Sequence, residues 1–154
     1  LVVAPAAAGT TGQPVTVSPV VVLTDPDSDI ESVVVTVTGG GTLGWGTLPV
    51  GITADDSVTG QVTFTGAASA AVYQQLLQSI TLTSASAGVS TVSFTVTDAD
   101  GNSNLPVATA VTVVGLPAAA PIVLTSIVSV PYTAGSTAVT VDPAMRTADR
   151  KSVR

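Results

Sequence analysis

The feature that most constrains this chain is a strict alternation of apolar and hydroxyl-bearing side chains in its middle. Val92, Phe94 and Val96 alternate with Ser and Thr residues, which is the pattern of a strand that buries one face. Residues 107–114 repeat the pattern beyond an acidic turn at residues 98–104. The two segments are therefore predicted to form a β-hairpin closed by that turn.

Composition extends this prediction to the whole fold. Hydrophobic residues make up 45% of the 154 residues, but only one Trp, two Tyr and two Phe are among them. The core must therefore consist mainly of Val, Leu, Ile and Ala, and β-branched residues favour strands over helices. With 14 Gly and 10 Pro to form turns, the chain is predicted to be an all-β sandwich.

Strand-like patterns occur along most of the chain. They lie at residues 15–17, 20–24, 33–37, 61–65, 80–83, 89–97 and 107–114. The apolar faces of these segments and of one helical segment predict the core, which comprises Val35, Phe64, Leu76, Val92, Phe94, Val96, Val111 and Val113.

The helical segment follows Ser69, a residue that can cap a helix N-terminus. Apolar residues then recur at spacings of three and four: Val72, Tyr73, Leu76, Leu77 and Ile80. We expect a short helix of two or three turns that crosses between the sheets.

An internal similarity indicates the domain organisation. Residues 15–20 (VTVSPV) recur as residues 139–144 (VTVDPA), a shift compatible with one domain length. We therefore expect a complete repeat at 1–115, a Pro/Ala-rich linker at 116–121, and the first strands of a second, truncated repeat at 122–145. The parent architecture is predicted to be a tandem array.

The distribution of charge separates the end of the chain from the rest. All four basic residues lie in the last nine positions, at Arg146, Arg150, Lys151 and Arg154. The second repeat stops resembling the first at this point, and residues 146–154 are expected to be a non-native or artefactual tail. Residues 1–145 contain all the carboxylates except Asp149 and no Lys, Arg or His, which argues against nucleic acid as a partner.

Several other functions are disfavoured by what the sequence lacks. There is no Cys or His, and the usual nucleophiles and general bases are therefore missing. The apolar runs are too short for membrane insertion. We expect a protein that is not an enzyme.

Two acidic loops are the strongest candidates for a functional site. They comprise residues 25–31 (DPDSDIE) and 98–102 (DADGN). Because no cation is present to pair with them, they must be either solvated turns or ligands of a metal ion. Asp55 and Asp56 stand apart and are expected to be solvated turn residues.

Four motifs, in this order, resemble a known family. They are Val22-Leu23-Thr24-Asp25-Pro26-Asp27-Ser28-Asp29, Gly60-Gln61-Val62-Thr63-Phe64, Tyr73-Gln74-Gln75-Leu76-Leu77-Gln78-Ser79-Ile80 and Val92-Ser93-Phe94-Thr95-Val96-Thr97-Asp98-Ala99-Asp100-Gly101. Together they resemble the cadherin-like, immunoglobulin-like tandem repeats of large bacterial surface proteins of the adhesin type. The resemblance covers nearly all of residues 10–145.

The resemblance implies a fold, a cofactor and a location. The fold would be an immunoglobulin-like (cadherin-like) two-sheet sandwich in a secreted or cell-surface protein. Both acidic loops would lie at one end of the sandwich. Asp25, Asp27, Asp98 and Asp100 would then bind one Ca²⁺ through hard oxygen ligands.

Three functions remain open from the sequence. The unit would be a calcium-stiffened spacer whose partners are neighbouring repeats of the same chain, which predicts a buried Trp45. Alternatively, it would recognise a surface glycan or protein through residues 39–60, which predicts an exposed Trp45 beside a shallow groove. The third possibility is strand exchange with a neighbouring subunit through residues 122–141.

Overall fold

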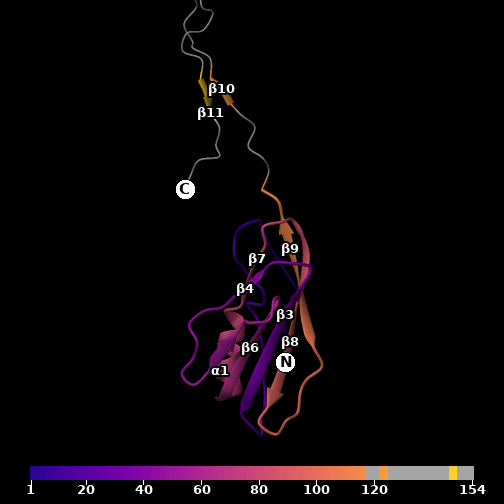
Figure 1. Cartoon of the computed structure of the whole chain (residues 1–154). Helices are drawn as coiled ribbons and strands as arrows, with labels where there is room; N and C mark the ends of the chain where they lie inside the picture. Colours follow the sequence, from indigo (N-terminus) through magenta and orange to yellow (C-terminus); the bar gives the residue numbers. More distant parts are fainter. Residues whose placement is uncertain (117–121, 125–145, 149–154) are drawn as a thin grey trace, which may run out of the picture. The chain divides into compact units, whose positions relative to one another are not determined.

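The computed structural model describes residues 1–116, 122–124 and 146–148. The chain divides into two compact units, residues 1–116 and 117–154. The first unit is a β-sandwich with two sheets and one helix (Figure 1), as the composition predicts. No helix in the described part of the chain is long and apolar enough to cross a membrane.

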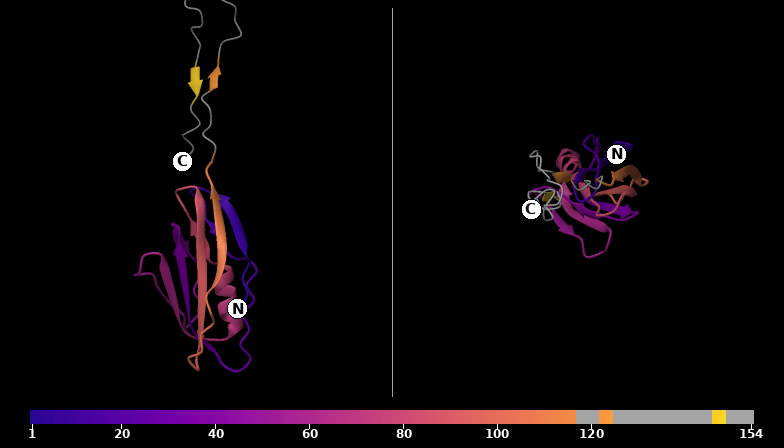
Figure 2. Two further views of the ribbon diagram at one scale, coloured as in Figure 1. Left: turned by 90° about the vertical axis from the view of Figure 1, so that its right-hand side faces the viewer. Right: turned by 90° about the horizontal axis from the view of Figure 1, so that it is seen from above.

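The larger sheet of the first unit has six strands in the order β1-β9-β8-β3-β6-β5. Their bounds are β1 Ala6–Thr10, β3 Ile30–Thr38, β5 Thr53–Asp55, β6 Gln61–Ala68, β8 Gly88–Asp98 and β9 Val107–Val114. All neighbours are antiparallel except β1 and β9, which run parallel. Figure 2 shows the indigo β1 beside the orange β9.

The second layer combines a smaller sheet with the helix. The sheet has the order β2-β7-β4, with β2 at Val15–Thr16, β4 at Thr42–Gly44 and β7 at Thr81–Thr83. Helix α1, Ala70–Gln78, connects β6 of the large sheet to β7 of the small one. It therefore makes the crossover between sheets that its periodicity predicts.

The core lies between these layers and agrees with the sequence pattern. All eight predicted core residues are buried, and Phe64, Val92, Phe94 and Val111 have no exposed surface. In the large sheet Val35 pairs with Phe94, which sets the apolar faces of β3 and β8 side by side. The predicted phase of these strands is confirmed.

Helix α1 buries one face and anchors one tyrosine. Tyr73, Leu76 and Leu77 are its buried residues. The Tyr73 hydroxyl lies 2.8 Å from the carbonyl oxygen of Gly66 and 3.3 Å from that of Glu31. Burial, with the Glu31 carboxylate nearby, raises the pKa of Tyr73 to about 12, so this hydroxyl keeps its proton and stays a donor.

The capping prediction for this helix is only half right. Ser69 is the N-cap residue, and its carbonyl oxygen accepts hydrogen bonds from the backbone of Val72 and Tyr73. Its side chain makes no capping hydrogen bond.

The strand predicted at residues 20–24 is wrong. Only an isolated bridge between Val2 and Val22 is present there. The Leu23 N–H instead donates to Gln74 Oε1 at 3.1 Å, and Gln78 Nε2 donates to the Val21 carbonyl at 3.3 Å. The segment therefore lies against α1, whose glutamine side chains take the place of a partner strand.

Three strands of the first unit were not predicted from the sequence. They are β1, β4 and β5. The β1 sequence AAAGT has no alternation of apolar and polar residues, and β4 and β5 have three residues each. Such segments carry too little pattern to be recognised, because pairing with longer neighbours defines them.

The chain runs from one end of the first unit to the other. We call the end formed by residues 24–29 and 98–104 the acidic pole. Leu1 lines a hollow there with Asp25 and Asp98. The Leu116 N–H lies 3.4 Å from Thr11 Oγ1, beyond the far end of the parallel β1–β9 pair.

Two buried hydroxyl groups form hydrogen bonds to the backbone of Ala4, in the segment that precedes β1. The backbone N–H of Ala4 donates to Ser18 Oγ at 2.8 Å, and Thr109 Oγ1 donates to the Ala4 carbonyl at 2.6 Å. Ser18 and Thr109 have no exposed surface. Val3 is also buried, so the segment before β1 is part of the fold.

In the second unit, β10 (Ile122–Leu124) pairs antiparallel with β11 (Arg146–Ala148). Strand β10 lies in the predicted first strands of a second repeat, and β11 lies in the predicted artefactual tail. Residues 139–144, which carry the second copy of the proposed repeat motif, and residues 117–121 of the predicted linker lie outside the described residues.

Candidate functional site

The two acidic loops lie together at one end of the first unit. Asp98 ends β8 and pairs with Ile30 at the start of β3. The Ala99 N–H donates to the Asp29 carbonyl at 2.9 Å, which ties the two loops directly. This is the arrangement that the family resemblance implies.

The first loop is organised around Asp25. Its Oδ1 lies 3.4 Å from the Asp27 N–H, and its Oδ2 lies 3.5 Å from Ser28 Oγ. The Asp25 side chain, through a hydrogen bond and its charge, raises the pKa of Asp27 above the ordinary value, and the charge of Asp100 adds to this. The first loop is therefore under carboxylate repulsion that also reaches across to the second.

The second loop satisfies its carboxylate internally. Asp98 accepts hydrogen bonds from the Asn102 N–H at 2.8 Å and from Asn102 Nδ2 at 3.0 Å. These contacts, led by the Asn102 side chain, lower the pKa of Asp98 below its ordinary value. Gly101 follows with φ +84°, a conformation that glycine adopts readily. This loop has the internal bonding of an ordinary acidic turn.

The carboxylates of the acidic pole are suitable ligands for a calcium ion, but their side chains are not arranged around a common point. Asp25 and Asp98 line one hollow of about 260 Å³, and all four predicted ligands are carboxylates, which Ca²⁺ prefers. However, no group of three Asp, Glu, His or Cys side chains in the described residues is arranged to hold a metal. Asp27 and Asp100 are exposed, and ligation by all four would require both loops to adjust.

A second hollow lies beside Trp45. The indole is half-buried, and its ring stands at 88° to that of Phe64 with centroids 5.5 Å apart. It therefore covers the core and also lines a hollow of about 210 Å³ with Thr42, Asp56 and Val58. This geometry lies between the two sequence expectations, since Trp45 is neither fully buried nor fully exposed.

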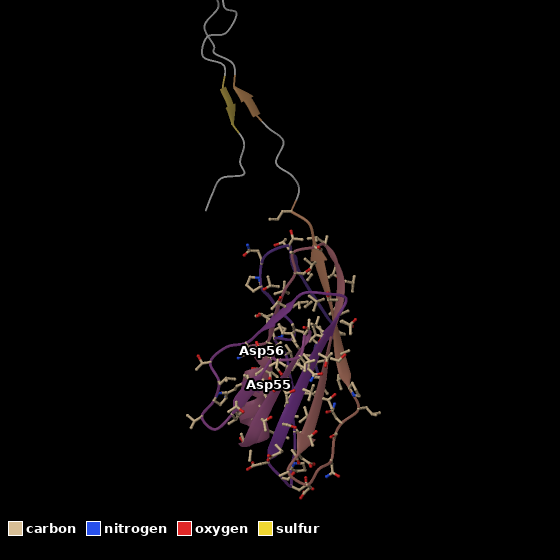
Figure 3. The ribbon with its side chains drawn as sticks, in the orientation of Figure 1. Asp55 and Asp56 are labelled. Carbon is tan, nitrogen blue, oxygen red and sulfur yellow. The ribbon has the colours of Figure 1, made fainter. Side chains whose placement is uncertain are left out.

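Two adjacent carboxylates, Asp55 and Asp56, are labelled in Figure 3, and they make different interactions. Asp55, the last residue of β5, accepts a hydrogen bond from the Ser57 N–H at 2.9 Å, and bonding to Ser57 lowers its pKa. Asp56 is the one that lines the hollow. Both carboxylates are exposed, as expected of solvated turn residues, but no local sequence pattern relates Asp56 to Trp45.

Comparisons with protein-family models, with curated proteins and with solved structures give no match to this chain.

Proposed function

We propose that the first unit is a non-catalytic repeat module that serves as a structural spacer in a large secreted or surface-anchored bacterial adhesin. The path of the chain is the observation that carries this proposal. Leu1 lies at the acidic pole, and Leu116 lies next to Thr11 at the far end of the β1–β9 pair. A unit whose chain ends lie at opposite poles lengthens a tandem chain with each copy.

The parallel pairing of β1 with β9 produces this path. Five consecutive residues of β1 pair with residues 110–114 of β9. A parallel strand advances about 3.3 Å per residue, and β9 has eight residues. Strand β9 alone therefore spans roughly 25 Å of the distance between the two ends.

The residue inventory supports the non-catalytic part of the proposal. The chain has no His or Cys, and its four basic residues all follow position 145. Its hydroxyls and carboxylates therefore lack the nearby bases and cations that usually activate a nucleophile or stabilise an oxyanion.

The calcium part of the proposal rests on the contact between the acidic loops. We expect Asp25, Asp27, Asp98 and Asp100 to bind one Ca²⁺ weakly, with a dissociation constant of about 0.1–1 mM as in other extracellular modules. A hydrogen bond with Asp25 and the charges of Asp25 and Asp100 raise the pKa of Asp27, and the bound ion would relieve the repulsion among these charges. Stability should then rise with calcium concentration.

Calorimetry with calcium tests this part. The double variant Asp27→Asn with Asp100→Asn should lose the binding heat, and the remote Asp55→Asn variant should keep it. Absence of heat from the unmodified chain at millimolar calcium would remove the ion from the proposal and leave the spacer role in place.

Small-angle X-ray scattering of parent-protein segments tests the spacer role. Segments that hold one, two and three consecutive units should be rod-like, and their maximum dimension should increase by about 35–40 Å per unit, the length of an 11-residue strand such as β8. A maximum dimension that fails to grow with the number of units would overturn the spacer function.

A further inference from the structure

The hollow beside Trp45 is lined by residues 41–43 and 45, at β4, and by residues 56 and 58–62, which lie between β5 and the first residues of β6. Strand β4 is the outer strand of the small sheet, and β5 is the outer strand of the large one. Trp45 directly follows β4, and Asp56 directly follows β5. Both residues therefore directly follow paired strands, with Trp45 half-buried and Asp56 exposed to solvent.

The lining combines an aromatic ring with a carboxylate. Trp45 and Val58 supply apolar surface, Asp56 supplies a negative charge, and Thr42 and Gln61 add polar groups. Val58 is 56% exposed, so apolar surface at the rim faces solvent. An aromatic ring and a carboxylate that line the same hollow are the combination that stabilises an organic cation.

The charge of the first unit favours the same ligand. Eight of the chain's ten carboxylates lie in this unit, and the other two are Asp142 and Asp149. The unit has no Lys, Arg or His. Asp56 therefore has no basic side chain of its own unit to pair with. The summed negative field attracts cations to the surface and repels anions.

We propose that this hollow binds the ammonium or guanidinium group of a Lys or Arg side chain on a partner protein. The cation lies against the indole of Trp45 and pairs with the carboxylate of Asp56. A volume of about 210 Å³ is below the roughly 300–1,000 Å³ of sites for drug-sized ligands. It therefore suits one side-chain head group rather than an oligosaccharide, and a neutral sugar would gain nothing from the negative field.

Fluorescence measures occupancy directly, because Trp45 is the one tryptophan of the chain. The full chain is titrated with the blocked tripeptide Gly-Arg-Gly, and with Gly-Gln-Gly as the neutral control. The Arg peptide should change the emission saturably, and the Gln peptide should not. Binding should weaken between 0.01 M and 0.15 M salt, as the screening length falls from about 30 Å to about 8 Å.

Two neighbouring substitutions separate the site from the surrounding charge. Asp56→Asn should weaken binding of the Arg peptide about threefold to fivefold, the size of an exposed ion pair. Asp55→Asn removes the same charge one residue away, and its Oδ1 can still accept from Ser57, so binding should change less. Equal weakening by both variants would mean that only the general field attracts the peptide, and the site would be overturned.

The remaining outcomes also decide the proposal. A saturable response to methyl glucoside, or an equal response to the Gln peptide, would identify a sugar site or a nonspecific surface instead of a cation site. A version of the chain with Arg146, Arg150, Lys151 and Arg154 changed to Gln removes the chain's own cations as competitors. If that version also gives no response to the Arg peptide, the inference fails, and the spacer function is unaffected.

Discussion

The backbone N–H and C=O groups of the first unit find their hydrogen-bond partners differently in the two layers. In the six-stranded sheet, strands pair with strands, and β3 pairs over most of its length with both β6 and β8. In the second layer, strands of two or three residues are supplemented by side chains. Gln74 and Gln78 bond the backbone of residues 21–23, and Ser79 Oγ accepts from the Gly46 N–H at 3.0 Å.

This difference shows where stability depends on burial and where it depends on particular polar groups. A strand of the large sheet can exchange one apolar residue for another and keep its backbone pairing. A segment held by a glutamine side chain loses its partner when that one residue changes. The large sheet should therefore respond to lost volume, and the second layer should respond to lost hydrogen bonds.

Removal of the Phe94 ring should have the largest effect on the free energy of unfolding. The side chain has no exposed surface, so Phe94→Ala should lower the free energy of unfolding by about 3–5 kcal/mol through lost burial and a cavity. Urea unfolding followed by the fluorescence of Trp45 measures this. A loss below about 1 kcal/mol would contradict the central place of Phe94 in the large sheet.

Removal of the Gln74 amide should have an intermediate effect. Gln74→Ala leaves the Leu23 N–H without its partner, which should cost about 1–3 kcal/mol. Gln75 is exposed on the same helix, and Gln75→Ala should change the free energy of unfolding by less than about 0.5 kcal/mol. If the two variants unfold alike, side chains do not replace strand pairing in the second layer.

Substitutions in the acidic loops should have the smallest effects on stability. Those at Asp98 and Asp27 should have opposite signs. The pKa of Asp98 is lowered from 3.8, so its stabilising contribution is present above that pH and is lost as the pH falls through the lower folded value. The pKa of Asp27 is raised from 3.8. Its folded form therefore gains stability as the pH falls towards 3.8 and loses it as the pH rises through the raised value.

Melting curves of two variants measure these effects. At pH 7 without calcium, Asp98→Asn should melt slightly below the unmodified chain, and Asp27→Asn slightly above it. The difference for Asp27→Asn should shrink as the pH falls towards 3.8. A fall in melting temperature for both variants would show that the first loop is not under carboxylate repulsion.

The same contrast explains how much the sequence predicts. The strands of the large sheet are recognisable where β-branched residues or apolar alternation continue over five residues or more, as at residues 33–37 and 92–97, and their predicted core residues are buried. Residues 20–24 have the composition of a strand, but their partner is a helix, and no local pattern encodes that choice. Strand β1 is defined by its pairing with β9, about 100 residues later.

The candidate sites divide in the same way. The contact between the two acidic loops follows from topology, because one loop precedes β3 and the other ends its neighbour β8. The sequence offers residues 39–60 around Trp45 as one possible recognition site, but it does not indicate which side chains share the hollow with Trp45. Asp56, Val58 and Gln61 reach it from beyond β5. Long-range packing is the information that local periodicity lacks.

The distance between the two ends of the first unit tests the spacer account most directly. The chain has no Cys, so Val2→Cys and Leu116→Cys, both at sites more than 60% exposed, would carry the only two spin labels. The parallel path from the acidic pole along β1 and β9 predicts a separation of about 30 Å by pulsed electron resonance. A separation below about 15 Å would place both ends at one pole and contradict the proposal that each unit lengthens the chain.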